Sequence, residues 1–227
     1  MFEHLFTPAL HSAQLFPNGI DTHCHILPGV DDGAPDIDTS LAIIREQIRS
    51  GLSGACCTPH IALRYPNNTP TRLREHFNQL QQSVEQQLGP NTFRLHLAAE
   101  YMIDEGLETA LQEQGAPLLL PGRRILVELP QYLMPDGWMD TLLHLKEQNY
   151  QPVLAHPERY LRHLSTEDIA AIAAQGIELQ GNIGSLTGYY GQHIKQRARS
   201  LRDQGLYTHW GTDAHSPRMM HQLRLKP

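Results

Sequence analysis

The sequence predicts an α/β protein in which short parallel strands alternate with amphipathic helices. Seven short apolar segments recur along the 227 residues, and stretches with helical periodicity lie between them. Parallel strands need such helical crossovers, which pack against the sheet. The sequence shows no change of composition that would mark a linker and no internal repeat. We therefore expect one domain, and the pattern favours a closed or nearly closed βα barrel over an open sheet.

The predicted strands are the short apolar segments, and the predicted helices lie between them. The strands cover residues 20–24, 54–58, 93–99, 125–129, 152–155, 177–180 and 207–211. The helices cover residues 38–51, 69–89, 134–150, 165–176 and 194–205. Asp38 or Thr39 can cap the first helix. Gly51 and Gly89 are expected to end the first and second helices, because glycine readily adopts the left-handed conformation found there.

Composition excludes several classes of function. A net charge of -6 and a pI near 6.1 give no electrostatic attraction to nucleic acid or to an anionic membrane. No run of about 18 apolar residues could span a membrane, and the first residues lack the basic and apolar regions of a signal peptide. Three cysteines without a disulfide framework are typical of a reducing compartment. We therefore expect a cytoplasmic protein.

Histidines and carboxylates recur where the predicted strands end. Residues i and i+2 of a strand point to the same face, so His23 and His25 project together, as do Asp213 and His215 after the last strand. Three further candidates follow the second, third and fifth strands, namely His60, Glu100 and His156. In a βα barrel the carboxyl ends of all strands meet at one face, where active sites lie. These side chains are therefore expected to share one pocket.

The expected pocket has the composition of a metal site. A single histidine at a strand end is more often structural, but two such pairs and three further side chains together predict a shared site. Nitrogen and oxygen ligands without a cysteine cluster disfavour structural zinc and favour Mn, Fe or catalytic Zn. Because one ion takes only about four to six ligands, the site could hold two or three divalent ions.

Six motifs resemble those of the polymerase-and-histidinol-phosphatase (PHP) superfamily: DTHCHILPGVDDG, TPH, AAEY, AHPERY, NIGSLTGYYG and GTDAH. Their order and spacing are most similar to the bacterial capsule-regulating branch, the metal-dependent protein-tyrosine phosphatases of the CpsB/YwqE type. This resemblance predicts a PHP phosphatase domain over 19–227, preceded by an N-terminal arm over 1–18. It implies a distorted seven-stranded (β/α) barrel of the PHP type and a trinuclear metal centre, commonly with manganese.

The resemblance also implies roles for individual residues. Eight side chains match metal ligands: His23, His25, Asp32, His60, Glu100, His156, Asp213 and His215. Among them, Glu100 matches the carboxylate that bridges ions. Arg159 matches an arginine that grips phosphate, and Arg218 matches a second phosphate-contacting arginine. Asp31, next to a matched ligand, is expected to point away from the metals.

The activity implied by the resemblance is hydrolysis of phosphotyrosine by a metal-activated water. The implied substrate is a bacterial tyrosine kinase that controls capsule or exopolysaccharide synthesis. Two alternatives stay open: a PHP phosphatase of a small phosphomonoester such as histidinol phosphate, and a non-catalytic metal-binding regulatory protein. The acidic charge balance disfavours a nucleic-acid phosphodiesterase. A cysteine-dependent mechanism is disfavoured because Val30, Ala62 and Leu63 stand where its arginine would follow each cysteine.

Five further residues have open roles. Arg64 and Tyr65 either contact a phosphopeptide at the pocket mouth or are solvated loop residues. Asn182 is expected to orient a ligand through a hydrogen bond. Glu128 and Tyr160 are expected to pack near the site or to support its ligands. The sequence leaves the oligomeric state open.

Overall fold

The computed structural model describes residues 10–112 and 115–227, and its main strands form two parallel sheets. The smaller sheet has the order β2-β3-β5, with β2 at Ile20–Cys24, β3 at Gly54–Cys57 and β5 at Arg94–Leu97. The larger has the order β10-β9-β8-β7-β6-β4. Its strands are His209–Gly211, Glu178–Asn182, Gln151–Ala155, Arg124–Glu128, Glu100–Met102 and His60–Ile61, in that order.

Two chain segments run from one sheet into the other. β3 is followed directly by β4, and β5 by β6. The break between β3 and β4 contains Pro59, which has no N–H to donate to a neighbouring strand. Beyond it the pairing resumes with His60 opposite Glu100. The sequence pattern did not predict β4 or β6 as separate strands, because each is only two or three residues long.

The other margins of the two sheets also touch. The Thr22 hydroxyl on β2 donates to the Trp210 carbonyl on β10 at 2.8 Å. One bridge joins Cys24 to Ala214. The larger sheet is a half-barrel, and the predicted α/β class with parallel strands is confirmed. Closure into a single seven-stranded barrel stays a prediction at this point.

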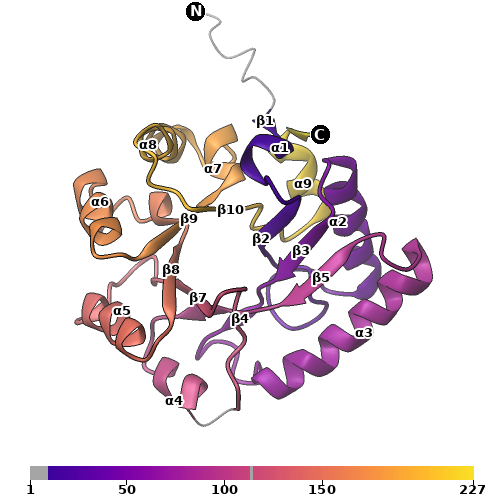
Figure 1. The fold of residues 1–227 in the computed structure, drawn as a ribbon, viewed down its shortest axis with the longest axis horizontal. Helices are drawn as coiled ribbons and strands as arrows, with labels where there is room; N and C mark the ends of the chain where they lie inside the picture. Colours follow the sequence, from indigo (N-terminus) through magenta and orange to yellow (C-terminus); the bar gives the residue numbers. More distant parts are fainter. Residues whose placement is uncertain (1–9, 113–114) are drawn as a thin grey trace, which may run out of the picture.

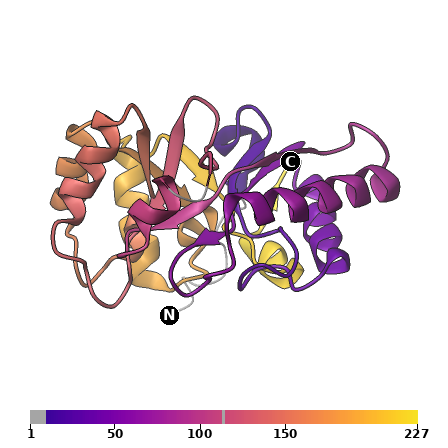
Figure 2. The ribbon, with the colours of Figure 1, turned by 90° about the horizontal axis from the view of Figure 1, so that it is seen from below.

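Helices surround the strands on the outside (Figure 1). The longer ones are α2 (Ile37–Arg49), α3 (Pro70–Leu88), α5 (Trp138–Glu147), α6 (Thr166–Ala174) and α8 (Gln192–Asp203). The shorter ones are α1 (Ser12–Leu15), α4 (Leu107–Gln112), α7 (Ile183–Thr187), α9 (Pro217–Leu223) and the 3-10 turn η1 (Pro157–Arg159). Seen from below, α5 and α6 lie at one end of the molecule and α2 and α3 at the other (Figure 2).

The predicted start of the first helix is wrong. α2 begins at Ile37, and its cap is Asp36, whose carboxylate accepts from the Thr39 N–H at 2.8 Å. Asp36 caps because its backbone is extended, the conformation that an N-cap requires. The expected end of α3 is confirmed, since Gly89 is its C-cap with φ of 91°.

Part of the predicted N-terminal arm packs against the same body. β1 (Leu10–His11) pairs in parallel with β11 (Leu225–Lys226), and Phe16 is only 3% exposed. Residues 1–9 of the predicted arm lie outside the described residues, so the boundary at residue 18 stays a prediction. Within the described ranges, no helix is long and apolar enough to cross a membrane.

A buried carboxylate, Asp21, holds β2 to its neighbours. It accepts hydrogen bonds from the Gln47 amide of α2 at 2.7 Å and from the Thr212 backbone N–H at 2.9 Å. The Thr212 hydroxyl and the His23 N–H also donate to it. Burial raises the pKa of Asp21 to about 6, although these hydrogen bonds favour the charged form. Asp21 therefore ties the first strand to α2 and to the loop after the last strand.

Replacing Asp21 by alanine is expected to lower the free energy of unfolding by about 3 kcal/mol, because several buried donors lose their acceptor. Urea unfolding of the wild type and of Asp21→Ala measures this. The matched control is Asp203→Ala, whose carboxylate is 65% exposed and whose loss should change stability by no more than about 0.5 kcal/mol. Equal stability of the two variants would contradict the role assigned to Asp21.

Candidate metal centre

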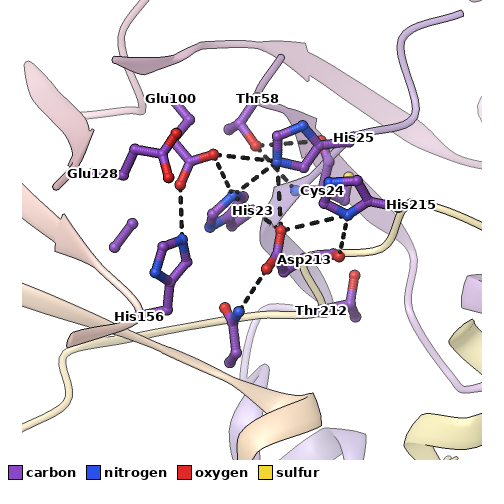
Figure 3. A network of polar contacts seen from close by, with 12 residues as sticks. His23, Cys24, His25, Thr58, Glu100, Glu128, His156, Thr212, Asp213 and His215 are labelled. Atoms are coloured by element: carbon purple, nitrogen blue, oxygen red, sulfur yellow. Dashed lines mark hydrogen bonds and ion pairs between the residues drawn. The ribbon is translucent and has the colours of Figure 1, made fainter. Parts of the chain in front are cut away.

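All eight predicted ligands converge at the carboxyl ends of the strands. Six of them line one cavity of about 420 Å³: Asp32, His60, Glu100, His156, Asp213 and His215. His23 and His25 lie beneath it and are fully buried. Figure 3 shows these two imidazoles between Glu100 on one side and Asp213 on the other. The expectation of one shared pocket is confirmed by this geometry.

The deepest ligand atoms surround Glu100 and Asp213. Glu100 Oε2 lies 3.3 Å from Nε2 of both His23 and His25. Its second oxygen, Oε1, lies 2.9 Å from Nε2 of His156. On the opposite side, Asp213 Oδ1 lies 3.5 Å from the same two nitrogens of His23 and His25. Glu100 thus reaches several histidines at once, as a bridging carboxylate must.

The outer ligand atoms are more exposed. Asp32 Oδ1 lies 3.4 Å from His60 Nε2 and 3.5 Å from His215 Nε2. The carboxylate of Asp32 is about half exposed, so this group opens toward solvent. The other nitrogen of His60, Nδ1, faces Glu100 at 3.1 Å and Glu128 at 2.9 Å. The ligand atoms thus form four groups of three or four. Within each group, all the atoms lie within 4.8 Å of one another, close enough to share a metal ion.

His156 Nδ1 is buried and has no hydrogen-bond partner in the described structure. His60 Nδ1 and Glu128 Oε1 are also buried and make no hydrogen bond, although they lie 2.9 Å apart as an ion pair. Buried polar atoms are nearly always satisfied, so an orphan of this kind needs an explanation. In addition, His23 Nε2 and His25 Nε2 face each other at 3.2 Å, with lone pairs directed at the same space. Divalent cations fit this set of nitrogen and oxygen donors.

The electrostatics of the site also favour positive charge at its centre. Burial lowers the pKa of His25 and of His60, but neighbouring carboxylates outweigh it. Asp31 and Glu100 raise the pKa of His25 well above its usual value. Glu100 and Asp32 raise that of His60 to about 9. For Glu100 the balance is reversed. Burial alone would raise its pKa, but His23 and His60 outweigh burial and hold the pKa well below its usual value.

Two polar side chains orient the central histidines from outside. Nδ1 of His23 donates to Gln180 Oε1 at 2.8 Å, and Nδ1 of His25 donates to Asp31 Oδ2 at 2.9 Å. Each bond fixes a proton on Nδ1, so Nε2 is the nitrogen that faces the cluster and can ligate a metal once it is deprotonated. Asp31 thus contacts the outer side of His25 and not the ligand cluster, as expected. Gln180 was not singled out from the sequence. The signal that could have found it is a glutamine inside a strand predicted to be buried, where a polar side chain needs a hydrogen-bond partner.

A second set of contacts fixes Asp213. Its Oδ2 accepts from Asn182 Nδ2 at 2.7 Å, Arg159 Nη1 at 3.0 Å and the Tyr190 hydroxyl at 3.1 Å. The amide of Gln180 in turn donates to Asn182 Oδ1 at 2.9 Å. Asn182 thus contacts Asp213, as expected of a residue that orients it, and the ligand role of Asp213 stays a prediction. One chain of hydrogen bonds therefore joins His23 on the first strand to Asp213 after the last strand.

Two residues at the site also have an unusual backbone conformation. His156 and Asp213 adopt positive φ values of 34° and 52°, a conformation that costs about 1–3 kcal/mol for residues other than glycine. Glycine is required where strands approach closely. A Cβ atom on Gly211 would lie 2.5 Å from that of His23, and one on Gly33 would lie 2.1 Å from the His25 carbonyl oxygen.

The two predicted phosphate-binding arginines differ in position. Arg159 lines the cavity, and its guanidinium lies 4.8 Å from the centre of the Tyr190 ring. Arg218 is exposed in the first turn of α9 and is absent from the described lining of the cavity. The structure therefore does not bring Arg218 to the site, because α9 turns its next residue, Met219, inward. A phosphate contact by Arg218 stays a prediction without support from the cavity wall.

Two other residues, Arg64 and Glu128, lie closer to the ligand cluster than the sequence indicated. Arg64 lines the cavity mouth, with Nη2 2.8 Å from His60 Nε2. Glu128, which was expected only to pack or support, contributes a carboxylate to the group formed with His60 and Glu100. The signal that could have found Glu128 is its place at the end of β7, which matches the strand-end positions of the other ligands.

The three cysteines lie apart from this chemistry. Cys24, Cys56 and Cys57 are free and buried. Burial raises the pKa of each thiol, that of Cys56 to about 12. A reactive thiolate needs a lowered pKa, so these side chains act as small apolar groups.

Removing the hydrogen-bond acceptor behind His23 is expected to weaken metal binding. Gln180→Met keeps the length of the side chain but cannot hold the His23 tautomer, so Mn²⁺ affinity should fall about 10- to 100-fold. Calorimetric titration of Mn²⁺ into metal-stripped protein measures it. The control Gln180→Glu retains an acceptor oxygen, so its Mn²⁺ affinity should fall less than that of Gln180→Met. Wild-type affinity in Gln180→Met would contradict this role.

Metal binding is also expected to release protons. Because the pKa values of His25 and His60 are raised, both imidazoles are largely protonated in the metal-free protein at neutral pH and must lose a proton to ligate. The apparent Mn²⁺ affinity should therefore rise with pH through about 9, where His60 is half deprotonated, and level off only above the pKa values of both imidazoles. Titrations in buffers of different ionisation enthalpy count the protons. Identical heats in all buffers would show that none is released.

Comparison with known proteins shows the family. The family described as "Capsular polysaccharide synthesis, CpsB/CapC" matches residues 19–222. The tyrosine-protein phosphatase YwqE of Bacillus subtilis (strain 168) is 30% identical over 200 residues, which cover 87% of this chain and 77% of that protein. The tyrosine-protein phosphatase CpsB of Streptococcus agalactiae is 24% identical over 217 residues, or 92% of this chain and 85% of that one.

A solved structure agrees with these relatives. It comes from a study of YwqE from Bacillus subtilis and CpsB from Streptococcus pneumoniae, described as unique metal-dependent tyrosine phosphatases. The match has a TM-score of 0.81 and 29% sequence identity, and covers 91% of this chain and 84% of that chain. The predicted family is thereby confirmed: this chain belongs to the CpsB/CapC family of capsular polysaccharide synthesis.

Proposed function

We propose that this chain is a metal-dependent phosphomonoester hydrolase that acts on phosphotyrosine in proteins. The observation that carries the proposal is the cavity itself, which combines a floor of metal-ligating groups with an apolar wall and arginines. The tyrosine phosphatases among the relatives support the same activity. Within this proposal, the two sheets close into one distorted seven-stranded barrel of the PHP type.

The metal ligands in this proposal are the eight predicted residues, with Glu128 as an additional carboxylate. Four overlapping donor groups support two or three ions, and Glu100 shares its two oxygens between groups. The nitrogen and oxygen donors favour manganese, with iron or zinc as alternatives. Divalent ions in such a site neutralise charge on phosphate oxygens and lower the pKa of a water.

The protein's own groups position the substrate. One N–H of Arg159 is engaged by Asp213, and a guanidinium has five, so others remain to hold phosphate oxygens. Arg64 at the mouth adds a second positive charge. Hydrolysis breaks the P–O bond to the tyrosine ring, adds the elements of water, and yields free tyrosine hydroxyl and phosphate. His215 donates through Nδ1 to the Asp213 carbonyl, so its Nε2 carries the lone pair that a metal ligand needs, and the attacking water supplies the proton that the leaving phenolate oxygen takes up.

The upper wall of the cavity fits an aromatic ester. It contains the apolar side chains Met102, Leu129, Pro130 and Met219, against which a phenyl ring can pack. A phosphomonoester with a cationic or strongly polar body, such as histidinol phosphate, would bury its polar groups against this wall at a cost. A non-catalytic protein has no need of an intact donor set, and phosphotyrosine therefore remains the best-supported substrate.

The physiological substrate we propose is a bacterial tyrosine kinase that controls capsule or exopolysaccharide synthesis. The support is the family's place in capsular polysaccharide synthesis. We place the protein in the cytoplasm, since its three cysteines are free, which is typical of a reducing compartment.

Phosphate release from a phosphotyrosine peptide tests the activity. Metal-stripped protein should be inactive, and adding back Mn²⁺, Fe²⁺, Zn²⁺ or Mg²⁺ one at a time should restore release with at least one ion. His156→Ala should lose this restoration, and Arg159→Ala should lower kcat/KM about 100- to 1000-fold by removing a charged donor.

His144→Ala is the matched control, because His144 is an exposed histidine on α5. It should retain wild-type turnover. If no ion restores phosphate release although Mn²⁺ binds, the small-molecule phosphatase and the non-catalytic metal protein become the better readings, and turnover of histidinol phosphate would distinguish them.

A further inference from the structure

The large apolar side chains that are exposed share one location on the molecule. Among the described residues they are Leu63, Tyr132, Leu133, Leu161 and Tyr189. Leu63 follows β4, Tyr132 and Leu133 follow β7, Leu161 follows β8 and Tyr189 follows β9. These strands are parallel members of one sheet (Figure 1). All five side chains therefore lie in loops at the face that holds the ligand cluster, and we call them the apolar rim.

The apolar rim is continuous with the cavity. Tyr132 and Tyr189 both line the cavity wall, while 87% and 43% of their side chains remain exposed. Leu133 follows Tyr132 directly and is 79% exposed. Leu63 precedes Arg64, which lines the cavity mouth. A molecule whose phosphate reaches the ligand cluster therefore passes Tyr132 and Tyr189, and an extended chain on either side of it can contact the rest of the rim.

Two residues of the apolar rim, Tyr189 and Leu63, are held in place by contacts with the rest of the protein. The Tyr189 ring packs edge-on against Tyr190 at 4.9 Å, and the Tyr190 hydroxyl donates to Asp213. The N–H of Leu63 donates to the Asp104 carboxylate at 2.9 Å. Exposed apolar groups on fixed supports lose little conformational entropy when they bind, which favours their use in recognition.

We propose that the apolar rim binds apolar side chains on either side of the phosphotyrosine in an extended segment of the protein substrate. This inference rests on the proposed function and deepens it, since it concerns the sequence around the phosphotyrosine. Grouped exposed apolar side chains mark binding surfaces, and continuity with the cavity identifies this occupant. Arg64 and Arg162 adjoin Leu63 and Leu161 in the chain, so an aspartate-flanked peptide is the competitor that tests charge as the selector.

Kinetics with matched peptides test the proposal. The substrates are phenyl phosphate, which has no flanking residues to contact Leu133 or Leu161, and phosphotyrosine peptides flanked by leucine, by serine or by aspartate. The wild type should hydrolyse the leucine-flanked peptide with about tenfold higher kcat/KM than the serine-flanked one. The double variant Leu133→Ser/Leu161→Ser should abolish that preference, mainly through a higher KM. Relative to phenyl phosphate, kcat/KM for the leucine-flanked peptide should fall about tenfold.

Conservative replacements provide the rescue. Leu133→Met/Leu161→Met keeps apolar groups at both positions and should keep the preference for leucine flanks. Because both leucines are exposed, neither change should unfold the chain, and circular dichroism of both variants checks this.

The outcomes separate this inference from the function on which it rests. Release from phenyl phosphate with no preference for leucine flanks, or a preference that persists in the serine variant, would overturn the rim assignment alone. A preference for aspartate flanks would do the same. A wild-type dimer that the serine variant abolishes, without any peptide preference, would assign the surface to self-association instead. Failure to release phosphate from every substrate would overturn the proposed function and the rim assignment together.

Discussion

The charge balance of a buried cluster is the constraint on which the rest of this structure depends. Glu100 and Asp213 are almost fully buried, and imidazoles of His23, His25 and His156 surround them. Burying carboxylates is costly unless positive charge and hydrogen bonds compensate. In this site protons on the imidazoles or bound cations meet that need. The raised pKa values of His25 and His60 and the unpartnered Nδ1 of His156 both reflect this need for compensating charge and hydrogen bonds.

The contacts behind the ligands make this arrangement specific. Gln180 and Asp31 select which nitrogen of each central histidine faces the cluster. Asn182 and Arg159 hold one oxygen of Asp213, so that the other faces the histidines. The buried carboxylate of Asp21 joins the first strand to the loop that carries Asp213. The first and last strands are thus held together by the same polar network that orients the ligands.

The face that contains this network also carries the features that we propose select a substrate. Apolar side chains form part of the cavity wall, and Arg64 and Arg159 supply positive charge at the mouth and beside Asp213. Tyr132 and Tyr189 extend from the wall into the apolar rim. In the proposed complex the phosphate would contact the ligand cluster, the tyrosine ring would contact the apolar cavity wall, and the flanking residues would contact the apolar rim. A small phosphomonoester would contact only the ligand cluster and the cavity wall.

The sequence by itself determined the α/β class, the parallel strands, the family and which histidines and carboxylates meet at the site, because each rests on local periodicity or on motifs. Spacing of i and i+2 placed His23 with His25, and strand-end positions placed His60, Glu100 and His156 beside them. Glu128 has the same strand-end signal and lies in a donor group with His60 and Glu100, while the cap of α2 was misplaced because Asp36, Asp38 and Thr39 can all cap a helix.

Only the tertiary structure decided which residues stand behind the ligands and which arginine reaches the cavity. Gln180 contacts His23 across 157 positions of sequence, and no local pattern encodes such a pairing. Arg159 enters the cavity wall and Arg218 does not, because the direction of a side chain depends on how η1 and α9 pack against the sheets. The left-handed backbone at His156 and Asp213 has the same origin: it persists because the surrounding contacts hold it, and those contacts come from distant parts of the chain.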